Sequence, residues 1–549
     1  MKNKLIFGLS LFVLVGCVDL ETEPGGSTVT SKQQEEVGVS NPENFLKTNI
    51  NAIFASLKAY MPVTGTNGTG TKRHNDFGYP SIMMFTDANG FDVVSEDNGY
   101  NWSGNELDFS DRVYTSNESL IVWNTLYKMI FATNDVISKV DPQSEDPVVR
   151  FYAAQTLAVR AFDYWVGAQL YQFNYQTHKD SLCLPLITEA NAIEAATEGC
   201  PRSTVAEVYA QIMKDIDAAI ECLTYAQENG VKREDKRYID LAVAYGIRAR
   251  VNLTMGNWAA AASDAQAAID NSSSTPSDLA TASRPAFWTV EEADWMWGII
   301  VAETDDIVES GIVNYPSHMG CLNWGYCQYS GGRQINKQLY NSINETDVRK
   351  GWFLGPDTTS ANLTPTEISY MRDYVEYPAY TQCKFAPYKN VLDQDMNAND
   401  IPLMRIEEMY LILAEGKAMS NAADAKTVLE GFIKTYRDPA YVCPDVTGKD
   451  LQEEIWRHRR IELWGEGLSW FDIMRLGKGV DRRGAGYPSA NTIYNIPAGS
   501  PILLWRIPES EIEANKQISE SDNNPNAPAP EAVDDIEDGD GEGGEGGEA

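Results

Sequence analysis

The sequence predicts a mostly helical protein, on three observations. Strand patterns are weak and scattered, with the apolar run at 82–85 as one example. Residues 237–270 span 34 positions, the length of a tetratricopeptide repeat, with small residues where two helices must approach closely. Apolar residues recur at helical spacing in several long segments, and these expected helices lie at 45–60, 120–140, 150–173 and 204–227.

The chain begins with a pattern typical of an exported lipoprotein, over residues 1–17. Two lysines precede the apolar run 5–15, which has the length of a signal-peptide core and is too short to span a bilayer. Small residues then precede Cys17, an arrangement that resembles a bacterial lipobox. The resemblance implies cleavage before Cys17 and its lipidation, which would anchor the protein to a membrane. An ordinary secretory signal is the alternative, and both predict export from the cytoplasm.

Two polar segments flank the predicted body. Residues 18–40 contain glycines and no periodic apolar pattern, which predicts a flexible tether. The acidic residues just after Cys17 are similar to those of Bacteroidetes lipoproteins that reach the outer face of the cell. Residues 521–549 are rich in proline, glycine and acidic residues, with ten carboxylates and little apolar surface. We expect this tail to be disordered.

The body, at 41–520, combines helical repeats with one long irregular region. A looser copy of the repeat runs over 403–436, and a third pairs the helices at 150–172 and 204–227 across an insertion. The repeats therefore cover about 150–270 and 401–476. Residues 271–400 are irregular and rich in glycine, asparagine, tyrosine and tryptophan. Long irregular insertions in compact proteins often carry function.

Composition excludes several classes of function. With 549 residues, of which 43% are hydrophobic, the chain can bury a large core. A net charge of −35 repels phosphate backbones, so we expect no nucleic-acid partner.

Seven cysteines follow Cys17, too sparse for a disulfide framework, although the spacing of Cys321 and Cys327 allows them to bridge a loop.

No catalytic, metal-binding or cofactor-binding motif is evident. The four histidines lack H-x-x-x-H spacing, and there is no G-x-S-x-G elbow or P-loop. The G-x-G-x-x-G match at 541–546 has no strand before it. The polar side chains at 393–399 could collect a calcium ion, or simply form a polar loop. The charged residues at 457–475 are interpreted as ion pairs that hold helices together.

The aromatic residues of the irregular loops are the best candidates for a binding site. Flat rings can stack on the apolar C–H faces of sugars, while neighbouring polar groups bond the hydroxyls. The alternative is that these rings brace their own loops. Trp295 and Trp297 alternate as on one face of a strand, so we place them in the core. The predicted glycan-binding residues are Asn98, Tyr100, Asn101, Trp102, Trp288, Tyr315, Trp324, Tyr326, Tyr329 and Arg333.

Four ordered segments resemble the SusD/RagB family of outer-membrane nutrient-binding lipoproteins. The resemblance covers roughly residues 41–515, with Gln172 and Lys516 as departures from the family pattern. The segments are RAFDY at 160–164 followed by QLY at 169–171 and LPL at 184–186; IPLMR at 401–405 followed by EMYL at 408–411 and AE at 414–415; RHRRIE at 457–462 followed by WFDIMR at 470–475; and WRIP at 505–508 followed by EI at 511–512 and Asn515.

The resemblance implies a SusD-like fold, with tetratricopeptide-type repeats as scaffold and long loop insertions on the ligand side. It implies a lipid-anchored protein of the outer membrane that faces the cell surface. Such a protein captures a poly- or oligosaccharide and passes it to a TonB-dependent, SusC-like transporter, without chemistry on the ligand. Three alternatives stay open: a RagB-like peptide-binding lid, an exported glycoside hydrolase with two carboxylates across a cleft, and a repeat scaffold that binds only protein.

Overall fold

The computed structural model describes residues 42–59, 63–64, 70–71, 74–309 and 311–536. The predicted lipoprotein signal with Cys17 and the predicted tether at 18–40 lie outside these residues. Within the described chain, every helix is too short or too polar to cross a lipid bilayer.

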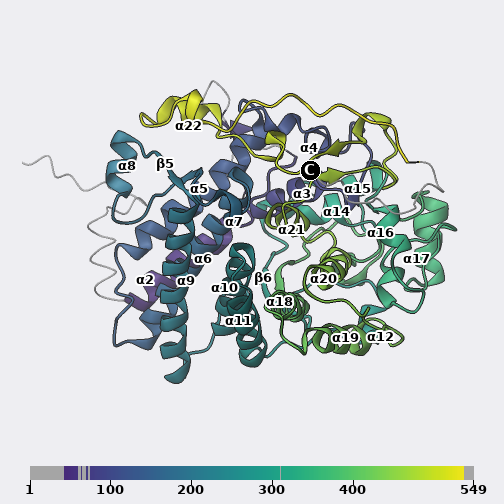
Figure 1. Ribbon diagram of the computed structural model, residues 1–549, viewed down its shortest axis with the longest axis horizontal. Coiled ribbons are helices and arrows are strands. Elements are labelled where there is room, and N and C mark those ends of the chain that lie inside the picture. Colours follow the sequence, from purple (N-terminus) through teal and green to yellow (C-terminus); the bar gives the residue numbers. More distant parts are fainter. Residues whose placement is uncertain (1–41, 60–62, 65–69, 72–73, 310, 537–549) are drawn as a thin grey trace, which may run out of the picture.

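Three pairs of packed helices form the scaffold, and the prediction of a mostly helical fold is confirmed. Contacts between α9 and α10 and between α11 and α18 join the pairs into one stack. Figure 1 shows α6, α9, α10 and α11 on the left of the molecule and α18 and α19 below its centre. The pairs are α6 (Pro147–Tyr171) with α9 (Val205–Glu228), α10 (Leu241–Met255) with α11 (Trp258–Asn271), and α18 (Ile406–Met419) with α19 (Ala425–Tyr436).

Two glycines explain how these helices turn and approach. Gly256 ends α10 in the left-handed conformation, with φ of 76°, so the chain reverses into α11 after only two residues. Gly416 lies within α18 at the contact with α11. A Cβ atom on Gly416 would lie 2.6 Å from the carbonyl oxygen of Trp258, so only glycine allows this close packing.

Other long helices complete the helical half of the molecule. The helices expected near the N-terminus and at 120–140 are present. A capping box between Thr204 and Glu207 fixes the start of α9 after its insertion. The remaining helices outside the irregular region are α2 (Pro42–Ser56), α4 (Gly104–Leu107), α5 (Asn117–Ile137), α7 (Tyr175–His178), α8 (Ala192–Glu198), α20 (Gly448–Glu462), α21 (Ser469–Arg475) and α22 (Glu509–Ala514).

The apolar run at 82–85 is a helix, so the strand reading of it is wrong. It lies inside α3 (Tyr79–Asn89), where all eleven residues are buried. A helix covered on every side has no polar face, and its apolar residues then form a continuous run like those of a buried strand. A run of four apolar residues does not by itself distinguish a buried helix from a buried strand.

The strands are short and pair two by two, all antiparallel. The β6–β8 pair places Trp295 and Trp297 in the core, fully buried as predicted, and it joins the irregular region to α18. The pairs are β1 (Val63–Thr64) with β2 (Gly70–Thr71), β3 (Val93–Val94) with β7 (Gln334–Ile335), β4 (Leu182–Pro185) with β5 (Arg202–Thr204), β6 (Trp295–Ile299) with β8 (Ile401–Arg405), and β9 (Val480–Asp481) with β10 (Asn495–Ile496).

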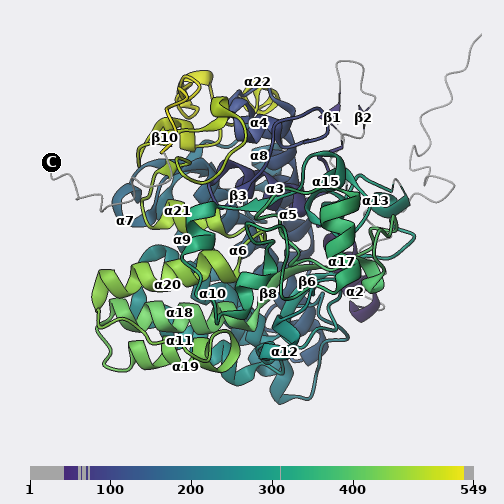
Figure 2. The same cartoon turned by 90° about the vertical axis from the view of Figure 1, so that its right-hand side faces the viewer.

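Between α11 and β8 the chain forms short helices, turns and the short strands β6 and β7, as the irregular composition indicates. Figure 2 shows α15 and α17 on the side opposite α18 and α20. The helices of this region are α12 (Leu279–Ala282), α13 (Asp306–Glu309), α14 (Tyr315–Met319), α15 (Tyr326–Tyr329), α16 (Lys337–Asn341) and α17 (Pro365–Ser369), followed by a π-helical turn at Tyr370–Tyr374.

The described part of the C-terminal tail is bound to the body, so the prediction of disorder from residue 521 is wrong there. The side chain of Asn524 is buried and donates to the carbonyls of Tyr171 and Trp505, at 2.9 and 2.7 Å. Arg202 donates to the Asn524 amide oxygen at 3.0 Å. Further along, the amide of Val533 donates to the carbonyl of Ile493. Polar anchoring of this kind leaves no apolar pattern in the sequence.

Candidate functional site

Two loops that carry exposed aromatic rings lie side by side, although more than 200 residues separate them. The first loop follows β3, and the second leads through α15 into β7. In the β3–β7 pair, Val93 lies opposite Ile335 and Val94 opposite Gln334. Because the strands are antiparallel, the segment leaving β3 and the segment entering β7 emerge at the same end of the pair. The pairing therefore brings the two loops together.

Three rings from these loops form an open surface, which we call the aromatic platform: Tyr100, Trp324 and Tyr329. Tyr100 is 55% exposed and Tyr329 is 51% exposed, which is unusual for such large side chains. Their ring centroids are 5.6 Å apart. Trp324 is half-buried, meets Tyr329 edge-on at 6.2 Å, and donates from Nε1 to the Tyr329 hydroxyl at 3.1 Å. The contacts orient the rings before any ligand arrives.

A buried arginine joins the two loops beneath the platform. Arg333 is 2% exposed and donates to the side-chain oxygens of Ser330 at 2.9 Å and Asn101 at 3.1 Å. Asn101 in turn donates to the Glu96 carbonyl and accepts from Ser103. The prediction that Asn101 and Arg333 contact a ligand is wrong, because both are buried. They position the platform instead.

A second layer of rings supports the platform from the side of α3. Trp102 lies against the His74 imidazole, with centroids 4.3 Å apart, and His74 hydrogen-bonds the Tyr326 hydroxyl. The buried His318 stacks on Tyr326 at 4.9 Å. Burial lowers the pKa of His318 to about 3, so this imidazole is neutral. Trp102 stays partly accessible, whereas Tyr326 is buried and belongs to the support.

The other predicted site residues occupy three different settings. Tyr315 is only 4% exposed and donates its hydroxyl to the Gly465 carbonyl, so its predicted ligand contact is wrong. Trp288 meets Tyr388 edge-on at 5.8 Å and belongs to that separate pair. Asn98 is partly exposed at the platform, where its side chain accepts from the Tyr100 amide at 3.0 Å.

A further exposed tyrosine near the platform was missed from the sequence. Tyr374 is 70% exposed and stacks on Tyr370, with centroids 5.7 Å apart. The Tyr370 hydroxyl donates to Asp393 at 2.9 Å and accepts from Gln328, a residue of α15, at 3.4 Å. The cluster of four tyrosines at 370–380 was a usable signal, since the platform loops are tyrosine-rich in the same way.

Among the residues that the structure describes, carboxylates border the platform. Glu96 and Asp97 are exposed in the first loop, directly before Asn98. Partial burial and the neighbouring Asp108 and Glu96 raise the pKa of Asp97 above its ordinary value. An anionic ligand would meet repulsion here.

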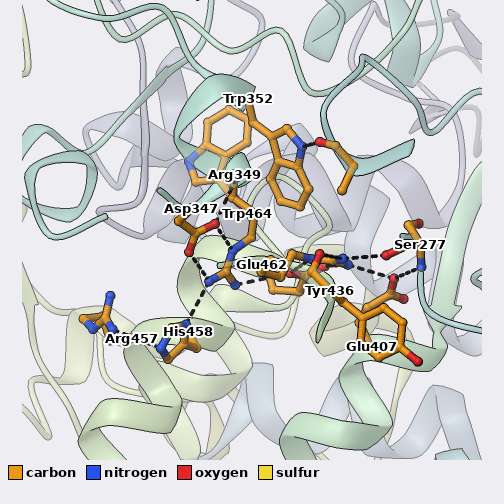
Figure 3. Close-up of polar contacts among 12 residues, drawn as sticks. Ser277, Asp347, Arg349, Trp352, Glu407, Tyr436, Arg457, His458, Glu462 and Trp464 are labelled. Atoms are coloured by element: carbon orange, nitrogen blue, oxygen red, sulfur yellow. Dashed lines mark hydrogen bonds and ion pairs between the residues drawn. The ribbon is translucent and has the colours of Figure 1, made fainter. Parts of the chain in front are cut away.

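The charged residues at 457–475 form a buried structural network, as the sequence interpretation holds. Glu462 accepts from Arg437 at 2.8 Å, Arg405 at 3.1 Å and Arg349 at 3.2 Å. Burial alone would raise the pKa of Glu462, but these three arginines outweigh it and hold the pKa well below its usual range. Figure 3 shows the network, with Arg349 lying between Asp347 and His458. Arg457 and Arg460 stay partly accessible, whereas Glu462 and its three arginine partners are buried, so a substrate has no access to that carboxylate.

The polar residues at 393–399 point to different partners. Asn397 donates to the carbonyls of Gly311 and Trp324, and Asn399 donates to that of Ala386. Both side chains are buried. Among the described residues there is no group of three or more histidine, cysteine, aspartate or glutamate side chains arranged to hold a metal ion.

Comparison with known families identifies the chain. One family model, described as starch-binding and associating with the outer membrane, matches residues 78–253. A second, described as the SusD family, matches residues 324–526, and together they span well over half of the chain. The chain belongs to the SusD family. The first loop of the platform lies in the first match and the second loop lies in the second.

Relatives of the SusD family match along almost the whole chain. The SusD-like protein P2 of Formosa agariphila is 23% identical over 537 residues, which cover 92% of this chain and 97% of that protein. The crystal structure of a SusD-like carbohydrate binding protein from Bacteroides vulgatus has a TM-score of 0.70 at 24% identity, over 87% of this chain and 98% of that one. A laminarin binding SusD-like protein has a TM-score of 0.61 at 16% identity, over 88% and 99%. These structures share the fold.

Proposed function

We propose that this SusD-family protein is a cell-surface lipoprotein that captures poly- or oligosaccharides and delivers them to a TonB-dependent outer-membrane transporter. The aromatic platform carries the proposal. Tyr100 and Tyr329 lie open to solvent on loops held together by β3–β7, beside the half-buried Trp324, although burial would favour each exposed ring by roughly 1.5 kcal/mol or more. Rings exposed at this cost are suited to stack on sugar faces. The match to a family of starch-binding proteins that associate with the outer membrane, and the similarity to a laminarin binding protein, support this function.

The charge around the platform favours a neutral glycan. Glu96 and Asp97 border the rings, and in the described part of the chain Arg333 beneath them is buried and paired with neutral groups. Uronic-acid or sulfated polysaccharides would meet like charge, in a protein whose net charge is already −35. The hydroxyl edges of a neutral sugar can bond Asn98, the Tyr100 and Tyr329 hydroxyls and these carboxylates.

The proposal includes an anchor at the cell surface. Cys17 lies outside the described residues, and its lipidation is inferred from the sequence around it. A lipid anchor and a tether at 18–40 would let the body move while staying near a transporter. No bond-breaking step is assigned to this protein.

Binding to a panel of soluble polysaccharides tests the proposal. The mature protein should bind at least one neutral glucan, mannan or xylan and should be retarded in an affinity gel containing it. Alginate, polygalacturonate and a sulfated galactan should bind at least about tenfold more weakly at low salt, with the difference shrinking at high salt as screening grows. Retention of peptides with no glycan bound would favour the RagB-like alternative. Release of reducing ends in proportion to protein would favour a hydrolase.

A further inference from the structure

Two cysteines lie at the two ends of the segment that carries Trp324. The Sγ atoms of Cys321 and Cys327 are 3.1 Å apart, and neither side chain is exposed. Both sulfurs lie on the same side of the loop, near the carbonyl of Met319, at 3.9 and 3.7 Å. A disulfide bond is about 2.05 Å long, so a movement of about 1 Å would join them.

The other described cysteines are placed differently. Cys183, Cys222 and Cys383 each face a backbone carbonyl, at 3.8, 3.2 and 3.3 Å respectively. Within the described part of the chain, Cys321 and Cys327 are the one pair for which a sulfur–sulfur contact is recorded. Cys383 shares their small core cluster and is therefore the natural internal comparison.

The surroundings give the two thiols unequal reactivity. Burial would raise the pKa of Cys321, but hydrogen bonding with Cys327 and the nearby Arg333 outweigh it and lower that pKa. Burial and the same hydrogen bond raise the pKa of Cys327 well above its ordinary value. A thiolate is the nucleophile in disulfide exchange, so Cys321 is suited to attack first and Cys327 to resolve the mixed disulfide.

We propose that Cys321 and Cys327 form a disulfide bond in the exported protein, and that this bond holds the Trp324 segment of the aromatic platform in place. The oxidant is a disulfide-bearing thiol oxidase of the cell envelope. The Cys321 thiolate attacks the oxidase disulfide and releases one of its sulfurs as a thiol. The Cys327 thiol then loses its proton and attacks the Cys321 sulfur, which releases the second. Two protein thiols give up two electrons and two protons, and the oxidase becomes a dithiol.

Closure of this loop would fix Trp324 before the ligand arrives. The segment between the cysteines lacks regular structure until α15 begins at Tyr326. The backbone amide of Trp324 donates to Gln394 at 3.1 Å, and its indole holds Tyr329. A covalent bridge beneath the segment would reduce its conformational freedom in the unbound protein, so less conformational entropy would be lost when a ligand binds. This effect on affinity rests on the proposed function, whereas the bond itself does not.

Mass spectrometry of the protein from cell envelopes tests the bond without any ligand. The protein is denatured in an alkylating reagent without reductant and digested. We expect a peptide in which Cys321 and Cys327 are unalkylated and two hydrogen atoms are missing, while Cys383 is alkylated. Reduction before alkylation should convert both cysteines. Alkylation of both cysteines without reduction would overturn the proposal.

Substitutions test the effect on the platform. The double variants Cys321→Ser/Cys327→Ser and Cys321→Ala/Cys327→Ala should bind the glycan about three- to tenfold more weakly. Cys383→Ala is the matched control and should retain both the affinity and the disulfide. Because serine and alanine pack differently, the same loss of affinity in both double variants would point to loss of the bond, whereas a loss in only one would point to a packing defect. If the wild type binds no glycan, the proposed function fails while the mass measurement still decides the bond. Unchanged affinity in both double variants would refute the role in holding Trp324.

Discussion

At the residue scale, exposure and burial separate the ligand-facing rings from the residues that position them. Tyr100 and Tyr329 present about half of their surface to solvent, whereas Arg333 and Asn101 are hidden beneath them. The first pair would contact a ligand directly. The second pair acts on the ligand only by keeping the two loops at a fixed separation.

Loss of a platform ring should weaken binding with little effect on folding. We expect Tyr329→Ala to reduce glycan affinity about tenfold, because stacking contributes about 1–1.5 kcal/mol, and to leave the melting temperature nearly unchanged. Tyr329→Phe keeps the ring and loses the hydroxyl that accepts from Trp324 and can bond a sugar, so it is the matched control for stacking and should bind more tightly than Tyr329→Ala. Calorimetry and thermal melting of both variants provide the check. A large drop in melting temperature for Tyr329→Ala would instead mean that the ring braces its loop.

Two buried histidines should each lower the stability of the protein as the pH falls, whereas buried carboxyls with raised pKa values, such as Asp87 and Glu407 at about 8, act in the opposite direction. His458 contacts Arg349 at 2.9 Å, Arg457 at 3.0 Å and Glu454 at 3.2 Å, and burial lowers its pKa to about 4. The unfolded chain takes up protons near pH 6.5, whereas folded His458 and His318 stay neutral until lower pH. The contribution of these two histidines to stability is therefore lost as the pH falls below about 6.5. At pH 5 each histidine should cost about 2 kcal/mol relative to pH 7.

Urea unfolding at pH 5, 6 and 7 measures this dependence. His318→Asn should be less stable at pH 7 and should show a shallower loss between pH 7 and pH 5. His178→Asn, at a partly exposed site on α7, is the control and should keep the wild-type slope. The same change in unfolding free energy from pH 7 to pH 5 in the wild type and in His318→Asn would contradict the prediction.

At the scale of elements, the helix pairs were predictable from sequence, whereas the polar contacts that bind the C-terminal tail to the body were not. The helices α6, α9, α10 and α11 keep helical spacing and small residues at their crossings, so pattern and packing agree. The helix α3 was missed because it is buried on all sides. The rings predicted as a binding site lie in irregular segments, and such segments have no period that separates buried Tyr315 from exposed Tyr329. That distinction depends on contacts between distant segments.

The C-terminal tail should contribute to stability up to residue 536 at most. A chain that ends after residue 520 loses Asn524 and leaves Arg202 without two of its acceptors, so we expect it to lose about 2–4 kcal/mol of stability. A chain that ends after residue 536 keeps these contacts and should melt like the full-length protein. Chemical unfolding of both truncations is the measurement, with Asn524→Ala as the point variant that should account for much of the loss. Equal stability of the two truncations would refute the anchoring role.

At the scale of the whole molecule, the division into a helical half and an irregular half suits a protein with two binding partners. The stacked pairs offer a broad, regular surface, whereas the platform lies among the short helices of the other half (Figures 1 and 2). A ligand on the platform and a protein on the helical face could be bound at the same time. This arrangement fits the proposed transfer of glycan to a transporter.

The full-length lipoprotein should co-purify with a TonB-dependent outer-membrane barrel after detergent extraction. A specific complex of this kind needs an interface of at least ~1,000 Å². We expect Tyr329→Ala to co-purify as the wild type does, because the platform is not assigned to that interface. Quantitative proteomics of the purified complex is the readout. A protein recovered without any barrel, under conditions that keep other envelope complexes intact, would count against the partnership.

The Asn524 anchor also bears on the order in which the molecule can fold. Arg202 and Asn524 are 322 positions apart, so the β4–β5 insertion cannot acquire its last polar partner until almost the entire chain is available. Contacts this distant in sequence form slowly and late. The proposed export of the unfolded chain across a membrane would gain from such a delay, since a stable native state would be completed only after the final segment had been delivered.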